Sequence, residues 1–116
     1  MKCLIVDDSA PVRAMIRDVL KGEGTDFLEC GDGAEATALY AAERPDWVLM
    51  DIKMKQVDGL TAARAIKQSY PGAKIIIVTN YTDRSLREEA AQAGALAYVL
   101  KDNIAEILTI MTHHGM

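Results

Sequence analysis

The chain has 116 residues, of which 50% are hydrophobic and 26% are charged, and its formal net charge at pH 7 is -4. This length suits one hydrophobic core, so we expect residues 1–116 to form a single domain. The acidic balance argues against nucleic acid as a direct ligand. The sequence shows neither a run of about 18 apolar residues nor a signal peptide, so we expect a cytoplasmic protein with no membrane partner.

Short apolar segments alternate with helical patterns along the whole chain. We predict strands at residues 2–7, 26–30, 46–51, 74–79 and 97–100. Continuous apolar strands of this kind are typical of a parallel sheet that is buried on both faces.

Helical spacing fills the intervals between these strands. The first helix begins after Ser9, its expected N-cap, carries Pro11 in its first turn and ends at Gly22 and Gly24. The fourth helix is expected to begin at Thr82 or Asp83. The remaining helices are predicted at residues 34–43, 59–70 and 104–111. Strict alternation predicts (βα)5, a doubly wound α/β fold with right-handed crossovers.

Polar residues stand where four of the predicted strands end. Asp7 and Asp8 follow the first strand, Asp51 the third, Thr79 the fourth and Lys101 the fifth. Because the carboxyl ends of parallel strands line the crevice where an open sheet binds its ligands, we expect these side chains to converge. Three carboxylates, one hydroxyl and one ammonium suit a divalent cation together with a phosphoryl group.

These residue types divide the work of phosphoryl transfer. Carboxylate oxygens suit Mg²⁺, which keeps several waters and takes one or two protein carboxylates. Asp51 ends a central strand and is the expected nucleophile, since carboxylates form acyl phosphates. Lys101 would neutralise one phosphoryl oxygen, and Thr79 would donate a hydrogen bond to another. No glycine-rich phosphate loop follows any predicted strand, which counts against a nucleotide site of the Rossmann or P-loop type.

The motifs at these strand ends resemble the receiver domain of two-component response regulators. The similarity spans about residues 2–112, and it is carried by residues 4–9 (LIVDDS), 48–54 (VLMDIKM), 57–59 (VDG), 76–79 (IIVT) and 94–101 (GALAYVLK). The resemblance implies a flavodoxin-like sheet with strand order 2-1-3-4-5. It also implies a phosphoacceptor in signal transduction, which catalyses no reaction beyond its own phosphorylation and dephosphorylation.

The same resemblance implies roles for individual residues. Asp51 would accept a phosphoryl group from a phosphohistidine on a sensor histidine kinase or a phosphotransfer protein. The expected groups around Mg²⁺ are Asp7, Asp8, Asp51 and the backbone carbonyl of Lys53. Thr79 and Lys101 would bind the phosphoryl oxygens.

Further roles concern the response to phosphorylation and its duration. Thr79 and Tyr98 would form a switch, with the Tyr98 ring turning inward as Thr79 moves toward the phosphate. The side chains of Lys53 and Tyr81 would flank the path of the attacking water and tune the phosphorylated lifetime. The fourth helix, the fifth strand and the fifth helix would form the output face, through which a homodimer can also form.

Three positions depart from the family's frequent pattern. Lys55 and Asp102 stand where many members have proline, and Asn80 stands where many have a small residue. Lys101 followed by Asp102 resembles the subfamily whose receivers precede a helix-turn-helix DNA-binding domain. The sequence leaves open whether this is a single-domain regulator or part of a longer chain, and it does not name the kinase, the signal or the output.

Two other functions compete with this interpretation. A pseudo-receiver would be a binding module that never takes phosphate, although all the site positions here carry competent residues. An aspartyl-phosphate phosphatase of the haloacid dehalogenase type would need a second acid two residues after its nucleophile. Asp7 is followed at that distance by Ser9, and Asp51 by Lys53.

Overall fold

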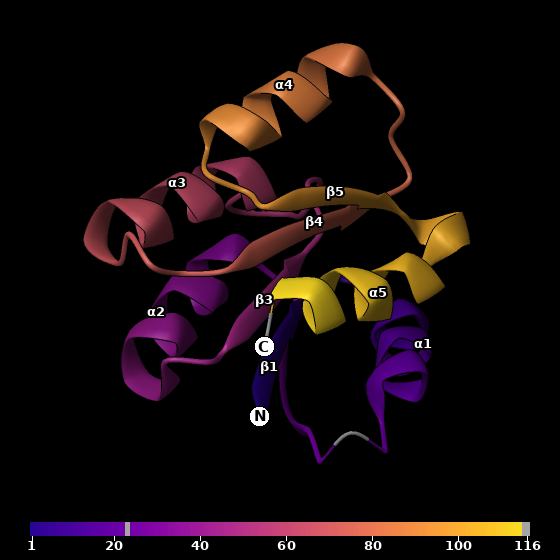
Figure 1. The fold of residues 1–116 in the computed structure, drawn as a ribbon. Coiled ribbons are helices and arrows are strands. Elements are labelled where there is room, and N and C mark those ends of the chain that lie inside the picture. Colours follow the sequence, from indigo (N-terminus) through magenta and orange to yellow (C-terminus); the bar gives the residue numbers. More distant parts are fainter. Residues whose placement is uncertain (23, 115–116) are drawn as a thin grey trace.

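The computed structural model describes residues 1–22 and 24–114 (Figure 1). Strands and helices alternate along this part of the chain, as the sequence predicts. In chain order they are β1 (Lys2–Val6), α1 (Ala10–Leu20), β2 (Asp26–Cys30), α2 (Gly33–Glu43), β3 (Trp47–Met50), α3 (Gly59–Ser69), β4 (Ile75–Thr79), α4 (Arg84–Gln92), β5 (Ala97–Leu100), the 3-10 turn η1 (Lys101–Asn103) and α5 (Ala105–His114).

The five strands form one parallel sheet in the order β2-β1-β3-β4-β5, which confirms the predicted fold. The register pairs Val6 with Met50 and Thr79 with Leu100. Because paired strands end level with each other, the residues that follow them emerge at one edge of the sheet. This register is what brings together the polar residues after β1, β3 and β5.

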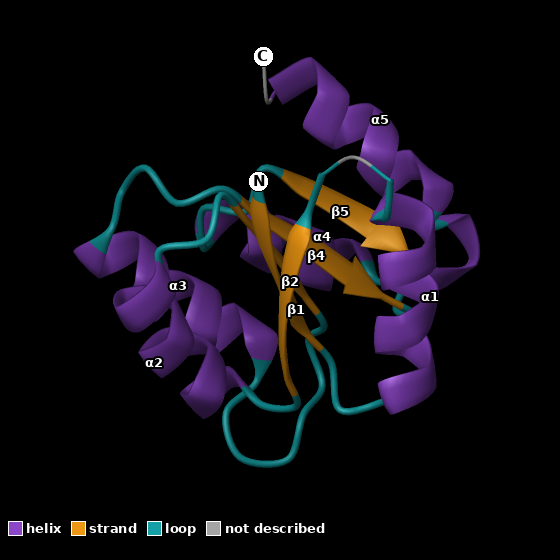
Figure 2. Cartoon of the chain, turned by 90° about the horizontal axis from the view of Figure 1, so that it is seen from below, coloured by secondary structure: helices purple, strands orange, loops and turns teal. Residues whose placement is uncertain are grey.

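Helices cover both faces of the sheet (Figure 2). One buried cluster joins the sheet to α2, α3 and α4 and contains Leu4 and Val48, whereas the other joins it to α1 and α5 and contains Ile5 and Leu49. Neighbouring strand residues therefore point into opposite cores, as expected for side chains that alternate across a strand. Both cores require apolar residues, which explains why β1, β3 and β4 have nearly continuous apolar sequences.

The helix starts follow the expected signals with one exception. Ser9 caps α1 by accepting the N–H of Val12 at 3.3 Å, and a proline lies in the first turn of that helix. The residue before α4 is Asp83 rather than Thr82, and its side chain makes no capping hydrogen bond. None of the helices in residues 1–22 and 24–114 has the length and hydropathy needed to cross a lipid bilayer.

The first and third strands are shorter than predicted, because each ends one residue before an aspartate of the site. Asp7 and Asp51 lie just beyond β1 and β3, yet their backbones continue the ladder. The Asp7 N–H donates to the Cys30 carbonyl at 3.1 Å, and the Asp51 N–H donates to the Val6 carbonyl at 2.9 Å. Both aspartates therefore leave the sheet on a backbone that the neighbouring strand still holds.

Candidate functional site

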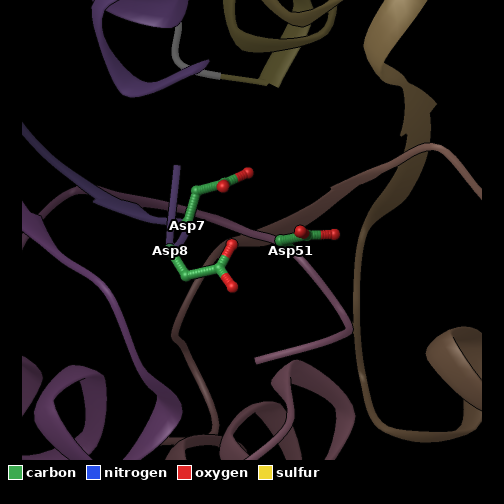
Figure 3. A group of neighbouring side chains, drawn as sticks. All are labelled: Asp7, Asp8 and Asp51. Carbon is green, nitrogen blue, oxygen red and sulfur yellow. The ribbon is translucent and has the colours of Figure 1, made fainter. Parts of the chain in front are cut away.

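Three carboxylates meet at the carboxyl edge of the sheet (Figure 3). Asp7, Asp8 and Asp51 each offer an oxygen, and these oxygens lie within 4.8 Å of one another. Asp7 and Asp51 are buried, whereas Asp8 is exposed. The cluster is therefore anchored in the protein on one side and open to water on the other, which suits a hard cation that retains part of its hydration shell.

Backbone N–H groups orient the two buried carboxylates. The Ser9 N–H donates to Asp7 Oδ1 at 2.8 Å, and the Ile52 N–H donates to Asp51 Oδ1 at 2.8 Å. In both residues the first oxygen is held by the turn that follows the strand. The second oxygen of each then faces the lysine that follows β5.

Lys101 places its ammonium between these two second oxygens. Its Nζ lies 2.8 Å from Asp7 Oδ2 and 2.9 Å from Asp51 Oδ2. Burial alone would lower the pKa of Lys101, but the hydrogen bonds and charges of Asp7 and Asp51 outweigh burial and raise it. Lys101 therefore stays protonated at neutral pH and supplies a fixed positive charge.

The carboxylate cluster has an excess of negative charge and spare acceptor capacity. Three carboxylates face one ammonium, which leaves two excess negative charges. The contact from Lys101 to Asp7 Oδ2 is an ion pair without good hydrogen-bond alignment, so this buried oxygen remains without a hydrogen-bond partner. A divalent cation would balance the charge and would use that oxygen directly or through a bound water. The donor set therefore fits Mg²⁺.

Thr79 brings a hydroxyl to the same edge of the sheet. It ends β4, is fully buried, and its Oγ1 has no hydrogen-bond partner. A buried polar group without a partner costs free energy, so the hydroxyl gains from any ligand oxygen that enters the site. The register places Thr79 opposite Leu100, one residue before Lys101.

Two exposed side chains approach each other beside the carboxylates. Lys53, two residues after Asp51, places its ammonium 5.7 Å from the ring centre of Tyr81, two residues after Thr79. The Tyr98 hydroxyl donates to the Tyr81 carbonyl at 2.8 Å, and the Arg87 guanidinium lies 4.6 Å from the Tyr98 ring centre. Contacts therefore run from the rim of the site to α4. The predicted role of the Lys53 carbonyl as a metal ligand stays a prediction.

The sequence interpretation missed one residue near the site, Asp32. We assigned residues 30–33 only to the turn before the second helix. In the structure the carboxylate of Asp32 is buried and accepts N–H groups from both its own helix and the loop after β3. An aspartate before a predicted helix signals an N-cap, but nothing in the sequence pointed to the second loop.

The model of the response regulator receiver domain family matches residues 3–112. The chain is 41% identical over 101 residues to the chemotaxis protein CheY of Bacillus subtilis, and the match covers 86% of this chain and 84% of that protein. The transcriptional regulatory protein PdtaR of Mycobacterium tuberculosis is also 41% identical over 101 residues, a match that covers 86% of this chain.

This chain spans about half the length of PdtaR, since the match covers 49% of that protein. Among solved structures, the fold is similar to a chain in the CheX-CheY-BeF3-Mg²⁺ complex from Borrelia burgdorferi. The TM-score is 0.90 with 26% sequence identity, and the match covers 98% of this chain and 89% of that chain.

Proposed function

The chain belongs to the response regulator receiver domain family, whose members are signalling modules, and we propose that it accepts a phosphoryl group on Asp51 in a Mg²⁺-dependent reaction. One observation carries the assignment to Asp51. Its carboxylate alone is shared by the metal-binding cluster and by a central strand end, and it pairs with Lys101 at 2.9 Å. The donor is a phosphohistidine of a sensor kinase or phosphotransfer protein.

The transfer step needs little covalent chemistry from the protein. A carboxylate oxygen of Asp51 attacks phosphorus, the P–N bond of the donor histidine breaks, and the leaving nitrogen takes the electron pair and a proton. Lys101 then pairs with a phosphoryl oxygen in place of the carboxylate oxygen it holds beforehand. A bound Mg²⁺ neutralises charge on the phosphoryl oxygens, and the residues that would hold it are Asp7, Asp8, Asp51 and the Lys53 carbonyl.

A direct test uses a small phosphodonor such as acetyl phosphate with Mg²⁺, followed by intact-mass measurement. The proposal expects a gain of one phosphoryl group, sensitive to alkali as an acyl phosphate is. A pseudo-receiver would show no gain, and the complete set of site residues disfavours that alternative. A phosphatase would turn over added phosphate esters, whereas here we expect only slow hydrolysis of the protein's own acyl phosphate.

Thr79 is proposed to couple the phosphoryl group to α4 and Tyr98. Its unpartnered hydroxyl gains a hydrogen bond only when a phosphoryl oxygen is present, and a ligand shifts an equilibrium only through such differential contacts. We expect Thr79→Ala to accept phosphate but to show smaller amide shifts around α4 on phosphorylation. Thr79→Ser keeps the hydroxyl and should respond as wild type does. Equal shifts in Thr79→Ala and wild type would contradict the coupling.

Tyr81 is proposed to shield the phosphoryl group from water. Its ring is 39% exposed and meets the Lys53 ammonium across the rim of the site. We expect Tyr81→Ala to speed spontaneous dephosphorylation several-fold, which corresponds to about 1 kcal/mol of barrier. Tyr81→Phe keeps the ring and should decay at nearly the wild-type rate. The measurement is a decay time course with Mg²⁺ after removal of the phosphodonor, and unchanged decay in Tyr81→Ala would refute the shielding role.

The output is proposed to leave through the face formed by α4, β5 and α5. The residues that the sequence assigned to this face are Arg84, Arg87, Tyr98, Asp102 and Glu106. Contacts from the site reach it through Tyr98 and Arg87. The reader of this face is a separate output protein, a second copy of the chain, or a DNA-binding domain such as the matched transcriptional regulators suggest.

A further inference from the structure

A buried aspartate outside the acidic cluster joins two loops at the carboxyl edge of the sheet. Asp32 is the N-cap of α2 and is only 8% exposed. Its Oδ2 accepts the Gln56 N–H at 2.7 Å, while its Oδ1 accepts the Ala34 N–H at 2.9 Å and the Val57 N–H at 3.2 Å. One carboxylate therefore caps α2 and also holds the backbone of the loop between β3 and α3.

A glycine next to Asp32 reinforces this link. The Gly33 N–H donates to the Val57 carbonyl at 3.1 Å. A Cβ added at Gly33 would lie 2.5 Å from the same carbonyl oxygen, closer than atoms can approach. The two loops are thus in direct backbone contact, and any side chain at Gly33 would push the β3–α3 loop outward.

These contacts enclose the segment that carries the expected backbone ligand of the metal. At the start of the loop, Ile52 donates its N–H to Asp51 and accepts the Gly59 N–H at 2.8 Å. At its middle, Gln56 and Val57 are bound by Asp32. Residues 53–55 therefore form a short span between two anchors, and the Lys53 carbonyl lies within that span.

Packing of side chains contributes little to holding this span. Lys53, Lys55 and Gln56 are exposed, and an open cavity lies between the loop and Asp8. Position 55 also lacks the proline that would restrict the backbone. Hydrogen bonds to a carboxylate are stronger than those between neutral groups, so the Asp32 contacts are the main restraint on the middle of the loop.

We propose that Asp32 is a positioning residue for the metal site, because its carboxylate fixes the β3–α3 loop and so directs the Lys53 carbonyl toward the three acidic side chains. The inference rests on the proposed function and deepens it. Groups that orient metal ligands without touching the metal typically change metal affinity 10–100-fold when removed.

The decisive variant is Asp32→Asn, because it separates capping from loop binding. Asparagine caps helices about as well as aspartate, so α2 should keep its N-cap. Its side chain has only one acceptor oxygen, so it cannot serve Ala34 and Gln56 from two oxygens. We expect faster hydrogen exchange at the Gln56 and Val57 amides and roughly 10-fold weaker Mg²⁺ binding, measured by amide-shift titration. Phosphorylation by acetyl phosphate should recover toward the wild-type rate when Mg²⁺ is raised to saturation.

Two further variants guard against a general loss of stability. Asp58→Asn removes the carboxylate that caps α3 through the Thr61 N–H at 2.8 Å, at the far end of the same loop, and should leave Mg²⁺ affinity unchanged. Gly33→Ala displaces the Val57 carbonyl while keeping the Asp32 carboxylate, and should weaken Mg²⁺ binding as Asp32→Asn does.

The outcomes separate the positioning role from the proposed function. Unchanged exchange at Gln56 and Val57 in Asp32→Asn would overturn the loop restraint. Faster exchange with wild-type Mg²⁺ affinity would overturn the positioning role, although wild type still took phosphate. Absence of Mg²⁺ binding in wild type would overturn the proposed function and the positioning role together.

Discussion

Asp51→Asn is expected to abolish the mass gain on treatment with acetyl phosphate and Mg²⁺. The amide is a far weaker nucleophile than the carboxylate, and its negative charge is lost. The variant should fold as wild type does, because the amide oxygen can still accept the Ile52 N–H and Lys101 keeps its ion pair with Asp7 at 2.8 Å. The measurements are intact mass after phosphodonor treatment and circular dichroism for the fold.

A matched control for this variant is Asp58→Asn, which makes the same chemical change at an exposed aspartate after the same strand. It should gain one phosphoryl group at the wild-type rate. A mass gain in Asp51→Asn at that rate would show that another residue accepts the phosphate. A gain in wild type that resists alkali would argue against an acyl phosphate altogether.

Asp8→Ala is expected to lose most of the affinity for Mg²⁺, at least about 10-fold, which corresponds to about 1.4 kcal/mol. Asp8 is the exposed member of the cluster, and its removal takes one of three carboxylates away from the cation. Without Mg²⁺ the variant should be no less stable than wild type, because repulsion among the carboxylates falls. The measurements are amide-shift titration with Mg²⁺ and the rate of phosphorylation at limiting Mg²⁺.

Thermal unfolding gives a second measure of the same effect. A ligand that binds only the folded state stabilises it by about 2.7 kcal/mol at 100 times its dissociation constant, so Mg²⁺ should raise the wild-type melting temperature. Asp8→Ala should lose this increment over the same concentrations. Asp18→Ala, which removes an exposed aspartate paired with Lys21 on α1, should keep it. Full Mg²⁺-dependent phosphorylation in Asp8→Ala would remove Asp8 from the set of ligands.

Much of the fold follows from local sequence. Strands buried on both faces need continuous apolar runs, so β1, β3 and β4 could be placed within one residue at each end. The start of α1 was equally legible, because Ser9 can cap a helix by its own side chain. Residues after strand ends could be grouped into one site because parallel strands end at a common edge, and the register confirms that Asp7 and Asp51 emerge together.

The tertiary structure decided which of these groups touch. It placed the Lys101 ammonium between Asp7 and Asp51 rather than on Asp8, and it left the Thr79 hydroxyl buried without a partner. Such details depend on side-chain directions at the ends of separate strands, which no local pattern encodes.

The link between Asp32 and the β3–α3 loop marks the boundary most clearly. By itself the sequence determined that an aspartate precedes a helix, since an N-cap depends only on the next few residues. The sheet order places β2 beside β1 and β1 beside β3, and thereby brings the loops after β2 and β3 to the same edge. Only that arrangement gives Asp32 the N–H groups of Gln56 and Val57, 24 and 25 positions away, because hydrogen bonds act over about 3 Å whatever the separation along the chain.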